Sequence, residues 1–170
     1  MEDQVRRSIL IAFTALLALA VAAPMAVAAA PPNPNSGAPV PVDETPTDLP
    51  AGAVFGRCDF PIRYQLSGKA KLLTLPGGRF ITTAPDQTAT LTNLDTGKTV
   101  TLSITGVFNQ TTDENGNVVT MATGRNLLGD PQAGFVLAIG NFSYVFDANG
   151  KLIQPLQGEG QLIDVCGLLS

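Results

Sequence analysis

Two cysteines, Cys58 and Cys166, enclose nearly every segment of the chain that has the pattern of a folded domain. A disulfide requires Cα atoms about 4.4–6.8 Å apart, so a bond between them makes the two ends of that region neighbours. Because such bonds persist in oxidising compartments, the pair also predicts a protein that leaves the cytoplasm. Two free, buried thiols are the alternative.

The first thirty residues have the three parts of a secretory signal peptide. Arg6 and Arg7 precede an apolar run from Ile9 to Ala23, and small residues follow at positions 26–30. We expect cleavage after Ala28 or Ala30, which makes the protein secreted and extracellular. An uncleaved membrane anchor is the alternative, because about 20 apolar residues span a bilayer.

Residues 31–52 differ sharply in composition, with seven prolines and no aromatic residue. Such a segment buries too little apolar surface to offset the entropy of ordering it, so we predict a disordered linker. It would serve as a spacer that holds the domain off a cell surface, or as a solubilising tail. Residues 53–170 remain as one domain with a single core.

Hydrophobic residues in this domain recur with a period of two, which predicts strands. The clearest case is 99–110, where Val100, Leu102, Ile104, Gly106 and Phe108 share one face and Thr99, Thr101, Ser103 and Thr105 the other. Similar strands are predicted over 60–66, 69–75, 79–83, 88–94, 118–126, 135–146, 151–156 and 161–166. No helical stripe follows the signal peptide.

Turn residues separate these strands at 76–78, 95–98, 113–117 and 147–150, where Asp or Asn precedes Gly or Pro precedes two glycines. Short connections make sequential strands antiparallel neighbours. The predicted fold is therefore all-β, an antiparallel up-and-down meander of seven to nine strands. We expect it to close into a barrel, because a Cys58–Cys166 disulfide would link the first strand to the last.

The strand over Phe135–Phe146 is apolar on both of its faces. A strand of this kind is covered by something outside its own sheet. A terminal segment or loop of the same chain is one candidate cover. A subunit interface that makes a homo-oligomer, or a surface for apolar ligands, is the other.

The composition excludes several kinds of chemistry. The chain has no histidine, so Ser-His-Asp and Cys-His catalysis and imidazole-based zinc sites are excluded. With both cysteines in a disulfide, thiolate chemistry is excluded as well. A net charge of −4 without a basic run does not favour nucleic acid, and no cofactor motif occurs.

The strongest candidate for a ligand site is a polar cluster at one strand end, made of Arg125, Asn126 and Asp130. It lies beside the longest connection that is not a hairpin turn, and loops at strand ends are where small β-proteins meet ligands. Tyr144, on the strand that is apolar on both faces, is the fourth candidate residue for ligand binding. An Arg125–Asp130 ion pair that fixes the loop is the simpler interpretation.

Other polar patterns have simple structural interpretations. Asp95-Thr96-Gly97 resembles an aspartic protease motif, but no second copy occurs and a hairpin turn accounts for it. The acidic turns at 113–117 and 147–150 lack the acidic twelfth position of a calcium loop. Glu159 and Asp164 would act as an acid/base pair only if they faced one cavity. No catalytic or metal site is predicted.

The stretch from Cys58 to Cys166, notably TGRNLLGDPQAGFVLAIGNF and GQLIDVC, resembles uncharacterised small secreted proteins of actinobacteria. That resemblance implies an exported domain and carries no catalytic motif. At the level of the fold alone, the meander is similar to the barrels of dirigent and allene oxide cyclase proteins.

Three functions are consistent with these observations. The first is a secreted, non-enzymatic β-barrel that binds a small apolar ligand or a partner protein. The second is an envelope-associated structural or interaction module with a packed core. The third, which the sequence favours least, is a cyclase- or isomerase-like enzyme that uses carboxylates and Arg125.

Overall fold

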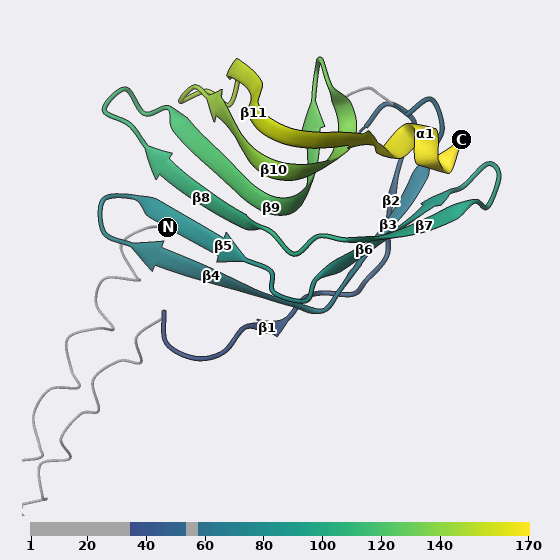
Figure 1. Ribbon diagram of the computed structural model, residues 1–170, viewed down its shortest axis with the longest axis horizontal. Coiled ribbons are helices and arrows are strands. Elements are labelled where there is room, and N and C mark those ends of the chain that lie inside the picture. The colour runs from purple at the N-terminus through teal and green to yellow at the C-terminus, as the bar shows by residue number, and fades with distance from the viewer. Residues whose placement is uncertain (1–34, 54–57) are drawn as a thin grey trace, which may run out of the picture. The chain divides into compact units, whose positions relative to one another are not determined.

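The computed structural model describes residues 35–53 and 58–170 (Figure 1). The predicted signal peptide, residues 1–30, lies outside the described residues, as do residues 31–34 of the predicted linker. Within the described ranges, no helix is both long and apolar enough to cross a membrane.

The regular structure of the described chain consists of antiparallel strands and one short helix, which confirms the all-β prediction. The strands are β1 (Val40–Pro41), β2 (Thr47–Leu49), β3 (Ile62–Ser67), β4 (Lys69–Leu75), β5 (Arg79–Thr83), β6 (Thr88–Asn93), β7 (Thr99–Ser103), β8 (Val107–Thr112), β9 (Val118–Asp130), β10 (Gly134–Phe146) and β11 (Leu152–Asp164). One short helix, α1 (Val165–Leu169), follows β11.

These strands form two sheets. The larger has the order β1-β4-β5-β8-β9-β10-β11, and the smaller has the order β2-β3-β6-β7. Between β3 and β8 the chain changes sheet three times, at Gly68, over residues 84–87 and over residues 104–106. Because β3, β6 and β7 pair in one sheet and β4, β5 and β8 pair in the other, each change of sheet is a bend in one longer strand. Counted this way, successive long strands are neighbours, as in an up-and-down meander.

The predicted closure into a barrel is not found. Among the described residues, β11 pairs with β10 alone, whereas the two neighbours of β3 are β2 and β6. The physical reason is that β2 occupies the edge of β3 that a barrel would have offered to the last strand. The two sheets separate along β9. Thr123 is the last residue of β9 that pairs with β8, and the rest of β9 does not pair with β7.

The Cys58–Cys166 disulfide is confirmed, with Cα atoms 5.2 Å apart. It does not join two paired strands, because Cys166 lies in α1 rather than at the end of β11. The helix contacts β6, β7 and β10, and Val165 and Leu169 on it are fully buried. A buried hydrogen bond from the Asn93 amide to the Leu169 carbonyl, 3.1 Å long, holds the far end of the helix to β6.

The described part of the predicted linker lies along the domain. Its strand β1 pairs with β4 and its strand β2 pairs with β3. A bidentate contact between Arg63 and Asp48, with N–O distances of 2.7 and 2.8 Å, fastens β2. The segment is extended, as its prolines require, but it is hydrogen-bonded to sheet edges, whose unpaired N–H and C=O groups accept a further strand.

Two hydrophobic clusters lie on the two faces of β10. Phe135 and Leu137 belong to the first cluster. Its other buried members come from β3, β6, α1 and the segments before β3 and after β7: Cys58, Ile62, Ala89, Leu91, Ile104, Val165, Cys166 and Leu169. Val136, Ala138 and Phe142 belong to the second, with Ala122 and Leu128 from β9. Each face of Phe135–Phe146 therefore carries a hydrophobic cluster of the same chain, as expected. The cover lies outside its own sheet only on the first face, because the second cluster is formed by strands of the same sheet.

The strand predicted over residues 99–110 is divided in the structure. Val100, Leu102 and Ile104 pack in the first cluster, as the alternation requires, but Phe108 packs against the second. The break falls at residues 104–106, where a Cβ atom on Gly106 would lie 2.1 Å from the Asn126 side chain. Glycine is needed here because the chain turns into the other sheet directly against that side chain.

Candidate functional site

The candidate site exists because β9, β10 and β11 bend sharply (Figure 1). Tyr144 pairs with Thr120, which lies eight residues before Leu128 on β9. On a straight strand eight residues span roughly 27 Å, yet Leu128 and Tyr144 line the same pocket. The strands must therefore curl back on themselves between these positions.

A row of glycines lies at the middle of this bend. Gly140 on β10 is the cross-strand partner of Gly124 on β9 and of Gly160 on β11. Their φ angles are 146°, 84° and 144°, which side-chain-bearing residues rarely adopt. A Cβ atom on Gly140 would lie 2.3 Å from the Glu159 carbonyl oxygen and 2.8 Å from the Gly160 Cα atom. Because glycine has no side chain, the backbones of the three strands can approach each other here and bend together.

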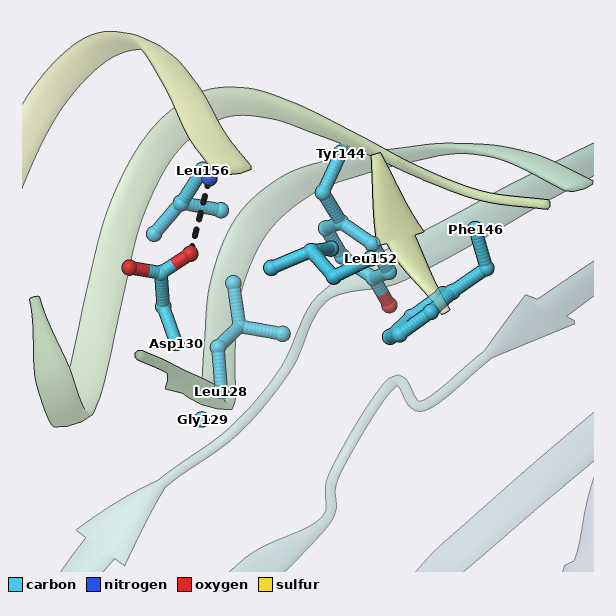
Figure 2. Close-up of a pocket in the computed structure, with 7 residues that line it drawn as sticks. All are labelled: Leu128, Gly129, Asp130, Tyr144, Phe146, Leu152 and Leu156. Carbon is cyan, nitrogen blue, oxygen red and sulfur yellow. Dashed lines mark hydrogen bonds between the residues drawn. The ribbon is translucent and has the colours of Figure 1, made fainter. Parts of the chain in front are cut away.

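Asp130, at the end of β9, fastens the bent strands to each other. Its Oδ1 atom accepts hydrogen bonds from the backbone N–H groups of Gln132 and Ala133, both at 2.8 Å, and so caps the hairpin to β10. Its Oδ2 atom accepts one from the backbone N–H of Leu156, at 2.9 Å, across a sequence separation of 26 residues (Figure 2). Leu156 has no register partner in β10, because the register shifts between the pairs Ser143–Gln157 and Val145–Gln154. Its N–H group can therefore bond to Asp130 instead.

A pocket of about 100 Å³ lies within the bend (Figure 2). Its walls come from three strands and carry a single charged side chain, that of Asp130. The lining residues are Leu128, Gly129, Asp130, Tyr144, Phe146, Leu152 and Leu156. Sites for drug-sized ligands measure roughly 300–1,000 Å³, so this pocket fits one small apolar group rather than an extended ligand.

Two aromatic rings make one corner of the pocket. Tyr144 and Phe146 stand at 83° to each other, with ring centroids 5.7 Å apart. Burial raises the pKa of the Tyr144 hydroxyl above its ordinary value, and a hydrogen bond with Thr120 acts in the opposite direction. Thr120 is itself fully buried and accepts a hydrogen bond from Gln110, at 3.2 Å. The tyrosine is therefore neutral at physiological pH.

Of the four residues that the sequence suggested for ligand binding, Asp130 and Tyr144 lie together in this pocket. Asn126 is buried, donates to the Thr123 carbonyl and packs against Gly106 instead. Arg125 lies on the other face of β9 and donates from Nε to the Ser103 carbonyl of β7, at 3.0 Å. Alternation along β9 thus directs Arg125 and Asp130 to opposite faces of the strand.

The other polar patterns belong to turns or to the surface. Glu159 and Asp164 are exposed and do not line the pocket. Asp113 accepts hydrogen bonds from Asn115 and Asn117, and Asp147 accepts from Asn149 and Lys151, as turn residues do. Within the described part of the chain, no group of three His, Cys, Asp or Glu residues is arranged to hold a metal ion.

Sequence reasoning missed the apolar walls of the pocket: Leu128, Phe146, Leu152 and Leu156. Their positions on predicted strands carry no sign that they converge, because the convergence depends on the bend. The available signals were Gly124 and Gly140, which lie inside the predicted strands 118–126 and 135–146, since glycine within a strand marks a bulge or a close approach of backbones.

Comparison of the chain with protein-family models, with curated proteins and with solved structures finds no match.

Proposed function

We propose that this protein is an exported, non-enzymatic binding module whose pocket within the bent strands β9, β10 and β11 takes one small apolar group. The observation that carries the proposal is the pocket itself, with leucines and two aromatic rings around a buried carboxylate. The group is a small ligand or a side chain of a partner protein. A concave, mostly apolar site with few polar groups is typical of such binding.

Two features support export. The N-terminal residues have the parts of a signal peptide, and a disulfide joins the first and last parts of the domain. The resemblance to small secreted actinobacterial proteins agrees with export and stays a prediction. We expect native mass spectrometry of protein from the culture medium of its own host to show a chain cleaved near Ala28 or Ala30 with an oxidised disulfide. A chain retained in the cell membrane would contradict export.

A pair of neighbouring variants tests the pocket. Leu152 lines it, whereas Ile153 follows on β11, is 51% exposed and is absent from the lining. We expect Leu152→Phe to fill the pocket and weaken the binding of benzene or toluene at least about tenfold, with Ile153→Phe unchanged. Amide shifts of Gly129 and Leu156 during an NMR titration would report the binding.

A second function is favoured by the small volume of the pocket. An envelope-associated structural or interaction module needs no cavity, and its core is packed to the normal density of a protein interior. If neither benzene nor toluene shifts the pocket amides of the unmodified protein, the binding proposal fails and this second function takes its place.

A further inference from the structure

We infer that the protein forms a symmetric dimer in which strand β11 of one copy pairs antiparallel with β11 of a second copy. The interface lies on the outer edge of the larger sheet, so the inference goes beyond the proposed function and does not rest on it. It depends on which sheet edges are open, on where β11 can pair and on the charges along it.

The outer edge of β11 is the first part of the argument. Among the described residues β11 pairs with β10 alone, which leaves the backbone groups of its other edge without a strand partner. The other outer strands of the two sheets, β1, β2 and β7, have two, three and five residues, whereas β11 has thirteen. Residues 157–162 are all exposed and include neither lysine nor proline, which commonly block such edges. This part of β11 is therefore an open template for another strand.

The limits of the open edge fix the centre of a symmetric pairing. On one side Leu156 already donates its N–H to Asp130, and on the other Asp164 is the N-cap residue of α1. Residues 157–163 lie between these limits, and Gly160 is their midpoint. A twofold axis at Gly160 pairs each residue with the one equally far from Gly160 in the second copy, which is an antiparallel arrangement.

The bend of the sheet gives the same centre. Gly160 ends the row of glycines in which Gly140 pairs with both Gly124 and Gly160. If Gly160 lies opposite Gly160 of the second copy, this row continues across the interface. Both copies then bend along one line, and their edges stay close over the whole paired span. A shifted register would place the two bends at different points and separate the edges.

The side chains along β11 fit this register. Glu159 is the one charged residue within 157–163, and it lies opposite Gln161 of the second copy, whose amide can donate to it. No like charges are directly opposite each other, an arrangement that would destabilise the pairing. Leu162, which is 44% exposed, lies opposite Gly158, where no side chain competes for the space.

Sedimentation equilibrium of the exported protein tests the dimer. We expect a monomer–dimer equilibrium between about 10 µM and 1 mM, because an interface of one strand pair is small. As the concentration rises, hydrogen exchange should slow at the amides of residues 157–163. The amides of β7, the free edge of the smaller sheet among the described residues, are the internal control and should not change.

Two glutamines of the same strand test the register. In the inferred pairing Gln161 lies opposite Glu159 of the second copy, whereas Gln157 lies opposite Ile163. Both glutamines are exposed and lie two residues from Glu159 in their own chain, so they are matched. We expect Gln161→Lys to tighten the dimer about threefold or more and Gln161→Glu to weaken it by a similar factor, because each dimer contains two such pairs.

Gln157→Lys and Gln157→Glu make the same changes in net charge. They should alter the dissociation constant less than about twofold, because position 157 is separated from Glu159 of the second copy by more than a Debye length at physiological salt.

Three outcomes would overturn the inference. The first is a protein that stays monomeric at the highest concentration. The second is a dimer to which the Gln157 and Gln161 variants respond equally, because another surface would then form it. The third is an assembly larger than a dimer, since a twofold pairing is closed. The proposed function is tested separately, by ligand binding to the pocket, and none of these outcomes decides it.

Discussion

At the scale of single residues, Asp and Asn side chains set the connections of this fold. Four side chains accept hydrogen bonds from backbone N–H groups two to four residues further along the chain: those of Asn93, Asp113, Asp130 and Asp147. Three of these turns are recognisable from sequence, because such residues mimic a backbone turn. Asp130 differs because its second oxygen also accepts the N–H of Leu156, which no local pattern encodes.

Replacement of Asp130 tests this double role. In Asp130→Asn the amide oxygen can still accept the N–H groups of Gln132 and Ala133, but the amide nitrogen would face the Leu156 N–H, and two donors cannot bond. We expect a loss of about 1–3 kcal/mol in the free energy of unfolding, because the partly buried Leu156 N–H is left without its acceptor. Urea unfolding would measure it. Asp113→Asn is the control, since every acceptor bond of Asp113 is local and its N–H donors lie in an exposed turn.

The dependence of stability on pH follows from the same residues. Hydrogen bonds from Asn117 and Lys151 lower the pKa values of Asp113 and Asp147, so their contribution is complete above the ordinary pKa and is lost as pH falls through the folded value. Burial raises the pKa values of Tyr64 and Tyr144. Above about pH 10 the tyrosine hydroxyls of the unfolded chain therefore lose their protons at a lower pH than those of the folded chain, and the free energy of unfolding falls.

Urea midpoints measured from pH 2 to 11 would check this profile. Because the chain has no histidine, we expect a plateau between about pH 5 and 9 with losses only at the two ends. The Asp113→Asn/Asp147→Asn variant should show a shallower acid loss than the unmodified protein. A midpoint that changes steeply between pH 5 and 8 would contradict this account.

At the scale of elements, glycines decide where strands bend. Phe135–Phe146 was recognisable as a doubly buried strand from its composition, and the structure confirms this with a cluster on each face. Its bend at Gly140 was not recognisable, since glycine in a strand pattern marks either a defect or a close approach. The cross-strand partners Gly124 and Gly160 resolve that ambiguity, and only pairing reveals them.

Two alanine variants separate crowding from backbone strain. Gly140 and Gly150 both have positive φ, at 146° and 79°, but a Cβ atom would meet backbone atoms at Gly140 and nothing within 4 Å at Gly150. We expect Gly140→Ala to lower the free energy of unfolding by about 1–3 kcal/mol more than Gly150→Ala does, because the contacting backbone cannot move aside. Equal losses in denaturant unfolding would show that the strands do not approach closely at Gly140.

At the scale of the whole molecule, described here over residues 35–53 and 58–170, the disulfide and α1 close the structure. The bond spans 108 residues and its two cysteines are 3% and 9% exposed. Among these residues β3 and β11 do not pair, so the sheets do not close into a barrel. The two ends of the domain are joined instead by the disulfide and by α1, which packs against β6, β7 and β10. The sequence led us to expect neighbouring strands because it showed no helix at the second cysteine.

Removal of the disulfide tests this kind of closure. We expect Cys58→Ala/Cys166→Ala to lose about 2–5 kcal/mol of stability. In hydrogen exchange, the amides of α1 should lose protection well before those of β9 and β10, whose ladder does not depend on the bond. Uniform loss of protection across the domain would instead indicate that the disulfide stabilises every strand equally, as in a closed barrel.

The sequence by itself predicted most of the strands, the Asp- and Asn-based turns and the disulfide, because period-two alternation, turn residues and two lone cysteines are local or countable features. Alternation shows that a residue such as Phe108 faces apolar neighbours, but not against which layer it packs. Only the tertiary structure decided the division into two sheets, the helix at Cys166 and the bend through Gly140. The pocket around Asp130 and Tyr144 follows from that bend, since it depends on contacts between residues far apart in the chain.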